Sequence, residues 1–100
     1  MNLFNNFPLK RFKIKNDSML PTIKAREEVI TISYILSKPK VGDIIVFKHI
    51  VPPFIFCKRI KKIINEEVWV EGENKKVSFD SRKFGFVEKK NIIGKVIIKL

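Results

Sequence analysis

Ser18 and Lys58 are the two residues of this sequence whose side chains could combine into a reactive pair. A serine hydroxyl holds its proton at neutral pH, so serine acts as a nucleophile only when a base lies within hydrogen-bond distance. The single histidine, His49, has no recognisable motif around it. If Ser18 is a nucleophile, its base is therefore expected to be a lysine, which can take the place of histidine in this role.

The segment around Lys58, residues 54–64, has two interpretations. As a helix it would carry an apolar stripe opposite a basic face, as helices on membrane surfaces do. As a strand it would place six residues on one face: Phe54, Phe56, Lys58, Ile60, Lys62 and Ile64. The other face would carry Cys57, Arg59, Lys61 and Ile63. The Ile and Phe content and the preceding Pro52-Pro53 favour the strand.

In the strand interpretation, Lys58 lies between Phe56 and Ile60 and loses hydration, which disfavours its charged form. The pKa of a free lysine is about 10.4, and burial lowers it by up to ~3–5 units. Arginine does not deprotonate in proteins, so Arg59 could not replace its neighbour as a base. Two plainer interpretations stay open: Lys58 as a surface lysine and Ser18 as part of a turn or helix cap.

Three segments follow one another along the chain: Ser-Met-Leu-Pro-Thr-Ile at 18–23, Cys-Lys-Arg-Ile at 57–60 and Ser-Phe-Asp-Ser-Arg-Lys-Phe-Gly at 78–85. In their order and residue types they resemble the three main boxes of the signal peptidase I family of Ser/Lys proteases. Residues 38–47 and 92–95 resemble strands of the family, and Gly72-Glu73-Asn74 resembles its Gly-Asp-Asn. The resemblance covers roughly residues 12–98.

The resemblance implies a role for each matched residue. Ser18 would be the nucleophile and Lys58 the general base. Ser78 would hydrogen-bond the Lys58 amine and orient it. Asp80 and Arg82 would form an ion pair that braces this loop, and an extended segment would put both on one side.

The resemblance also implies an oxyanion site and substrate contacts. The Ser18 backbone N–H would hold the oxyanion with a nearby side chain. The family often has serine or glycine two residues before the nucleophile, where this sequence has Asn16, whose amide can donate a hydrogen bond. Met19, Leu20 and Pro21 would shape shallow pockets for small side chains. No metal and no cofactor are expected.

By this resemblance the chain would be a serine endopeptidase that removes an N-terminal leader or signal peptide from a partner protein. The substrate would lie extended along a strand edge. The short layout, without a membrane anchor, is similar to the small maturation proteases of nickel-type superoxide dismutase. The lysine-rich surface keeps a signal peptidase as the alternative.

The expected fold is all-β, a compact signal-peptidase-like barrel or sandwich of short, mostly antiparallel strands. One hundred residues make one domain, 1–100, with residues 1–11 as an N-terminal arm. Alternating or apolar runs predict strands at residues 29–33, 43–48, 67–71 and 94–100. Turn formers bound these runs at residues 38–43, 51–53, 71–74 and 91–94.

The net charge of +11 suits attraction to nucleic acid or to an anionic membrane. Only four residues are arginine and no nucleic-acid motif is present, so no nucleic-acid partner is expected. No apolar run approaches the ~20 residues that span a bilayer, and residues 1–12 do not form a signal peptide. We therefore expect a cytoplasmic protein or one with peripheral membrane contact.

Two other classes of function remain open at this point. One is a non-enzymatic basic β-domain that binds nucleic acid or a membrane surface. The other is a protease fold that has lost its activity and serves as an interaction module. The intact set of Ser18, Lys58 and Ser78 argues against the second. The single Cys57 excludes an internal disulfide.

Overall fold

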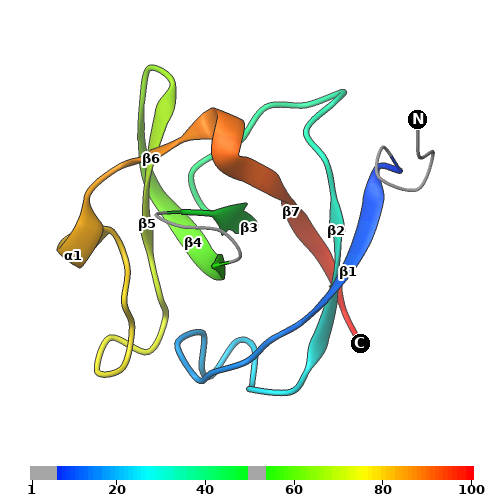
Figure 1. Ribbon diagram of the computed structural model, residues 1–100, viewed down its shortest axis with the longest axis vertical. Coiled ribbons are helices and arrows are strands. Elements are labelled where there is room, and N and C mark those ends of the chain that lie inside the picture. The colour runs from blue at the N-terminus through cyan, green and yellow to red at the C-terminus, as the bar shows by residue number, and fades with distance from the viewer. Residues whose placement is uncertain (1–6, 50–53) are drawn as a thin grey trace.

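The computed structural model describes residues 7–49 and 54–100. These residues form one strongly curled sheet of seven strands, all paired antiparallel, with a short helix beside it (Figure 1). The strands are β1 (Leu9–Lys13), β2 (Glu28–Ile32), β3 (Ile44–Lys48), β4 (Ile55–Ile64), β5 (Glu67–Glu71), β6 (Val87–Glu88) and β7 (Ile92–Lys99). The helical turns are α1 (Ser81–Phe84) and η2 (Lys89–Asn91). The all-β, antiparallel fold expected from the sequence is confirmed.

The strand order is β1-β2-β7-β3-β4-β5-β6. The last strand therefore lies in the middle of the sheet, where it joins the β1–β2 hairpin to the β3–β4–β5 meander (Figure 1). β1 and β6 are the two edge strands. Within residues 7–49 and 54–100, no helix has the length and apolar character needed to cross a bilayer.

Two groups of buried side chains hold the sheet together. The larger group comes from the meander and from β6: Ile45, Phe47, Ile60, Val68, Val70 and Val87. The second group lies between β2 and the segment that follows β1: Ile14, Met19, Ile23 and Val29. This second group fixes the segment that contains Ser18, because fully burying one such side chain stabilises the fold by ~1.5–3 kcal/mol.

The alternation predicted for β4 is correct up to Ile60 and wrong beyond it. The pairing of β4 with β5 shifts register between Ile60 and Lys62, as in a β-bulge. A bulge adds one residue to one strand and so exchanges the faces of the residues that follow. Ile63 therefore packs on the core with Ile60, whereas Ile64 is 48% exposed.

Four of the described strands match predicted segments, and β4 takes the strand interpretation of its segment. The sequence did not reveal β1, because its residues Leu-Lys-Arg-Phe-Lys are nearly all exposed on an edge strand. Residues 9–11 of the expected N-terminal arm belong to this strand. Residues 1–6 of that arm and the turn expected at 51–53 lie outside the described residues.

Candidate active site

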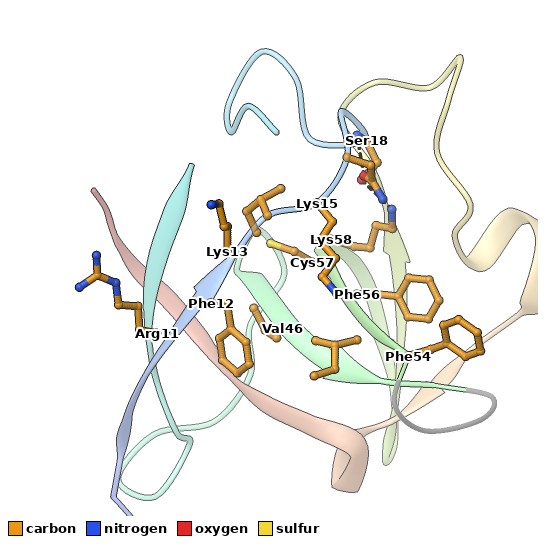
Figure 2. Close-up of a pocket in the computed structure, with 13 residues that line it drawn as sticks. Arg11, Phe12, Lys13, Lys15, Ser18, Val46, Phe54, Phe56, Cys57 and Lys58 are labelled. Atoms are coloured by element: carbon orange, nitrogen blue, oxygen red, sulfur yellow. Dashed lines mark hydrogen bonds between the residues drawn. The ribbon is translucent and has the colours of Figure 1, made fainter. Parts of the chain in front are cut away.

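Lys58 and Ser18 meet between β4 and the turn that follows β1. Lys58 Nζ lies 2.8 Å from Ser18 Oγ, with a hydrogen bond between them (Figure 2). Only 2% of Lys58 and 4% of Ser18 are exposed to solvent. Two residues that are 40 positions apart in the sequence are thus brought together out of bulk water.

β4 directs the Lys58 side chain toward the serine. Lys58 lies opposite Ile45 of β3 in the antiparallel ladder. It shares its face of β4 with Phe56, which packs on the core, and with the fully buried Ile60. The lysine therefore projects from an apolar surface on a paired strand, and its rotamers are restricted by these neighbours.

Burial lowers the pKa of the Lys58 amine below its ordinary value of 10.5. The negative charge of Asp80 acts in the opposite direction, whereas Arg82 lowers this pKa further. The amine therefore has a larger neutral fraction near pH 7 than an exposed lysine. Burial also raises the pKa of the neighbouring Cys57 thiol to about 12, so this sulfur stays protonated and does not compete as a nucleophile.

The turn that carries Ser18 is held from both sides. The Asn74 N–H donates to the Ser18 carbonyl at 2.8 Å, and the Asn74 amide donates to the Asp17 carbonyl at 3.2 Å. On the other side Met19 is completely buried in the second core group. Met19 has no accessible surface in this structure, and its expected role as a substrate contact stays a prediction.

Leu20 and Pro21 lie away from the serine and lysine. They line a shallow hollow at the surface, together with Glu73, Asn74, Lys75 and Lys76. Neither residue lines the cleft that contains the serine and lysine. A substrate contact at these two residues stays a prediction and involves a different hollow from the one beside the dyad.

Asn16 lies against Ser18, but in the reverse orientation to the expected one. Its side-chain oxygen accepts a hydrogen bond from the Ser18 backbone N–H at 3.0 Å. The expectation was that this N–H and the Asn16 amide would both donate to an oxyanion. The N–H is therefore already bonded in this state, and an oxyanion can use it only after the exposed Asn16 side chain rotates away.

Asp80 is the most heavily bonded carboxylate near the pair and has no solvent exposure. It accepts from Ser78 Oγ at 2.7 Å, from the Gly72 N–H at 2.9 Å and from Arg82 Nη2 at 2.7 Å. Burial alone would raise the pKa of this carboxyl, but the hydrogen bonds from Arg82, Ser78 and Gly72 together lower it well below its usual range. Asp80 is therefore ionised at any pH relevant to activity.

Two expectations for this loop differ from the structure. Ser78 donates to Asp80, whereas the hydrogen bond of the Lys58 amine goes to Ser18. The Asp80–Arg82 ion pair is present at 2.7 Å, but the segment is not extended. Asp80 is instead the N-cap of α1 and accepts the Arg82 backbone N–H at 3.1 Å, which brings both side chains to one side of the helical turn.

Gly72 allows the closest approach of backbone in this region. A Cβ on Gly72 would lie 2.7 Å from the Ser18 carbonyl oxygen and would overlap the Ser78 hydroxyl. Only a residue without a side chain fits between the nucleophile turn and the loop that carries Ser78. The match of Gly72-Glu73-Asn74 to a family box was the available sequence signal, although it did not indicate this packing.

Arg59 and Glu73 join β4 to the segment that follows Ser18, a role that the sequence did not predict. Arg59 Nη2 lies 2.7 Å from the Glu73 carboxylate, and Arg59 Nη1 donates to the Gly42 carbonyl at 2.6 Å. The Thr22 hydroxyl donates to the same carboxylate at 3.2 Å. The Arg59 hydrogen bond lowers the pKa of Glu73, which keeps this carboxylate charged and able to bind both Arg59 and Thr22.

A cleft of about 560 Å³ opens beside the serine and lysine. Its walls come from the end of β1 and the following residues on one side, and from β3 and β4 on the other (Figure 2). Its apolar lining consists of Phe12, Ile14, Val46, Phe54, Ile55, Phe56 and Cys57. The described residues contain no group of His, Cys, Asp and Glu that could hold a metal ion.

Comparison with known proteins assigns the chain to a family. Residues 2–64 and 51–100 match the family described as signal peptidase, peptidase S26. The chain is 28% identical over 146 residues to the probable thylakoidal processing peptidase 2, chloroplastic, of Arabidopsis thaliana, with 97% of this chain and 39% of that protein aligned. It is 28% identical over 121 residues to mitochondrial inner membrane protease subunit 2 of Saccharomyces cerevisiae, with 93% of this chain and 68% of that protein aligned.

The chain thus spans well under half of the first relative and about two thirds of the second. The family match covers nearly the whole chain and includes all three segments that resembled the family boxes. The resemblance inferred from the sequence is confirmed at the level of the family. The chain belongs to the signal peptidase family, peptidase S26, a family of serine-type peptidases.

Proposed function

We propose that this chain is a serine endopeptidase in which Ser18 is the nucleophile and Lys58 the general base, and that it removes an N-terminal leader or signal peptide from a partner protein. The observation that carries the proposal is the 2.8 Å contact between Lys58 Nζ and Ser18 Oγ, with both residues buried. The lowered pKa of Lys58 gives the amine the neutral fraction that a base needs.

The reaction follows from these two groups. Neutral Lys58 accepts the Ser18 proton while Oγ forms a bond to the scissile carbonyl carbon. The resulting ammonium then gives this proton to the leaving amine as the C–N bond breaks, which leaves an acyl ester on Ser18. Lys58 next takes a proton from a water molecule, whose oxygen attacks the ester, and returns it to Oγ as the ester bond breaks.

The oxyanion of each tetrahedral intermediate needs donors that are not free in the unbound state. Asn16 engages the Ser18 N–H through its side-chain oxygen, and the same amide carries an NH₂ group that can donate beside that N–H. Rotation of the Asn16 amide exchanges its oxygen for its NH₂ group, and the oxyanion then receives the Ser18 N–H and the Asn16 amide together. One such donor accounts for ~10²–10³-fold in rate.

The substrate side of the proposal rests on the family and on the shape of the cleft. Both relatives are named as a processing peptidase or a protease, which supports a protein substrate. A leader peptide lying extended in the cleft would pair with β1, an edge strand of the sheet that the described residues form, as extended peptides pair with sheet edges. Signal peptides and the leader of one dedicated partner are the two candidate substrates. The net charge of +11 supports peripheral contact with an anionic membrane.

The test is incubation of the purified protein with candidate leader-bearing proteins, followed by mass spectrometry of any new N-terminus. Cleavage at one site by the wild type, and none by Ser18→Ala or Lys58→Ala, is the expected result. Circular dichroism of the two variants controls for folding. Cleavage that persists in folded Ser18→Ala would refute the proposal. A chain that cleaves no candidate but binds nucleic acid or vesicles with a steep salt dependence would favour a basic binding domain.

A further inference from the structure

The cleft beside the dyad carries positive charge and no negative charge. Its lining includes four basic residues, Arg11, Lys13, Lys15 and Lys58, and no Asp or Glu. Two of these cations are already engaged: Arg11 pairs with Glu28 at 2.6 Å, and Lys58 bonds Ser18. Of the other two, Lys13 lies opposite Glu28 in the β1–β2 ladder and lowers the pKa of that carboxyl, so Lys15 remains as the lysine of the lining without an acidic partner among the described residues.

These two lysines differ in direction. In Figure 2 the Lys15 side chain extends into the space between the β1 segment and β4, and its nitrogen lies on the Phe56 side. The Lys13 nitrogen points away from it, toward the side where Arg11 lies. Lys15 is therefore the one cation of the lining that enters the cleft without a partner in the described chain.

The apolar walls around Lys15 strengthen the interaction of its amine with a charged group of a ligand. Phe54, Ile55, Phe56 and Val46 supply apolar surface on the opposite side of the cleft. When a ligand fills such a cleft it displaces water, and a lower local dielectric strengthens the attraction of an ammonium for a carboxylate. The same low dielectric penalises a second positive charge beside Lys15, so this one residue attracts an acidic side chain and repels a basic one.

Position along the chain sets where the complementary charge belongs. Lys15 precedes Ser18 by three residues. An extended substrate rises ~3.3 Å per residue. β1 ends at Lys13, and residues 16–18 form a bend and a turn, so Lys15 and Ser18 are no farther apart than three extended residues. A substrate side chain that faces Lys15 therefore lies within about three residues of the bond that faces Ser18. A lysine side chain reaches across such a pairing to its directly opposite neighbour.

We propose that Lys15 is a specificity-determining residue that selects substrates with an Asp or Glu within about three residues of the scissile bond and rejects substrates with a Lys or Arg at that position. The proposal rests on the proposed function, because it assigns the substrate class of that same cleft. It does not require Lys15 to take part in bond making or breaking.

Binding to an inactive protein tests the proposal without cleavage. Fluorescein-labelled ten-residue peptides of Ala, Ser and Gly, each with a single Glu, Gln or Lys scanned along the chain, are titrated with Ser18→Ala protein by fluorescence anisotropy at low salt. For at least one position we expect the Glu peptide to bind about fivefold more tightly than its Gln counterpart, and the Lys peptide about fivefold more weakly, the upper range for a partly exposed ion pair.

Variants in the Ser18→Ala background assign the effect to one amine. Lys15→Met should abolish the difference between the three peptides, and Lys15→Glu should reverse their order. Lys40→Met removes the same charge from an exposed lysine outside the cleft lining and should preserve the preference. Equal binding of the three peptides at all positions, no binding by any of them, or a preference that survives Lys15→Met would each overturn the proposal.

Cleavage by the active protein separates this proposal from the proposed function. With a leader-bearing substrate that is cut in a Ser18-dependent manner, replacing an acidic residue near the cut by Lys should lower kcat/KM by tenfold or more in the wild type and by less than twofold in Lys15→Met. Ser18-dependent cleavage without any charge preference refutes the Lys15 assignment alone. A charge preference in binding without Ser18-dependent cleavage refutes the proposed function alone.

Discussion

Gly72→Ala is a single methyl substitution that should disable the proposed dyad while the side chains of both members stay unchanged. The new Cβ would lie 2.7 Å from the Ser18 carbonyl oxygen, whereas ordinary contact begins at 3.4 Å. The nucleophile turn or the loop with Gly72 must therefore retreat by about 0.7 Å. If the whole displacement falls on Ser18, its Oγ moves from 2.8 Å to about 3.5 Å from Lys58 Nζ, at the limit of a hydrogen bond.

The size of the effect follows from this displacement. A misplacement near 1 Å of a reacting group costs up to ~10²-fold in rate, so kcat should fall by one to two orders of magnitude. Overpacking of this kind costs ~1–3 kcal/mol of stability. The assay is the rate of leader cleavage by each variant, measured with the free energy of unfolding in urea on the same preparation.

Gly94→Ala is the matched control. A Cβ on Gly94 would lie 2.8 Å from the Ile32 carbonyl oxygen of β2, a backbone clash of nearly the same depth as the one at Ser18, without the overlap with the Ser78 hydroxyl that Gly72→Ala also makes. Both variants should lose stability, and only Gly72→Ala should lose kcat beyond its unfolded fraction. If Gly72→Ala keeps kcat within twofold of the wild type while it loses as much stability as Gly94→Ala, the packing of Gly72 does not position the nucleophile.

Three further predictions concern the charges around the pair. The kcat/KM should rise with pH as Lys58 loses its proton, with a midpoint below 10.5, and Lys58→Arg should be as inactive as Lys58→Ala; a profile without this rise, or activity in the arginine variant, would place the base elsewhere. Asn16→Asp should lower kcat by about 10²-fold or more, because the carboxylate keeps its hydrogen bond to the Ser18 N–H and repels the oxyanion. Asn16→Ser should retain more activity. Equal rates in both variants would contradict a role for this side chain. Asp80→Asn should move the midpoint of the kcat/KM profile to lower pH, because Asp80 raises the pKa of Lys58, and Arg82→Gln should move it to higher pH, because Arg82 lowers this pKa. Shifts of the same sign in both variants would refute this account. Denaturant unfolding shows whether each variant is folded.

The sequence was sufficient for the parts of the fold that carry a strong local pattern. The strands rich in Ile, Val and Phe follow from composition, and the face of β4 with Lys58 follows from alternation. The collinear boxes identified the family, and the structure brings Ser18 and Lys58 together. Each of these inferences depends on residue types at fixed spacing, which a sequence displays directly.

The errors occur where tertiary contacts decide between local options. Nothing in the residues of β4 marks the bulge after Ile60, because it arises from pairing with β5. Asp17-Ser18-Met19 fits an exposed turn equally well, and only the core below it buries Met19. Ser78 had two acceptable partners, and the arrangement of Asp80 as a helix N-cap decided in favour of the carboxylate.

Asp80 and Arg82 form a charged pair close to Lys58, which must be neutral to act as the proposed base. An isolated buried carboxylate would hold Lys58 in its ammonium form, because an opposite charge favours ionisation. Arg82 binds both oxygens of Asp80, and Ser78 and Gly72 complete its hydrogen bonding. The carboxylate can then brace the loop against the turn that carries Ser18 while Arg82 offsets part of its effect on Lys58, and burial remains the largest influence on the pKa of the amine. The fold therefore keeps the rigidity of a buried ion pair and still leaves Lys58 able to release its proton.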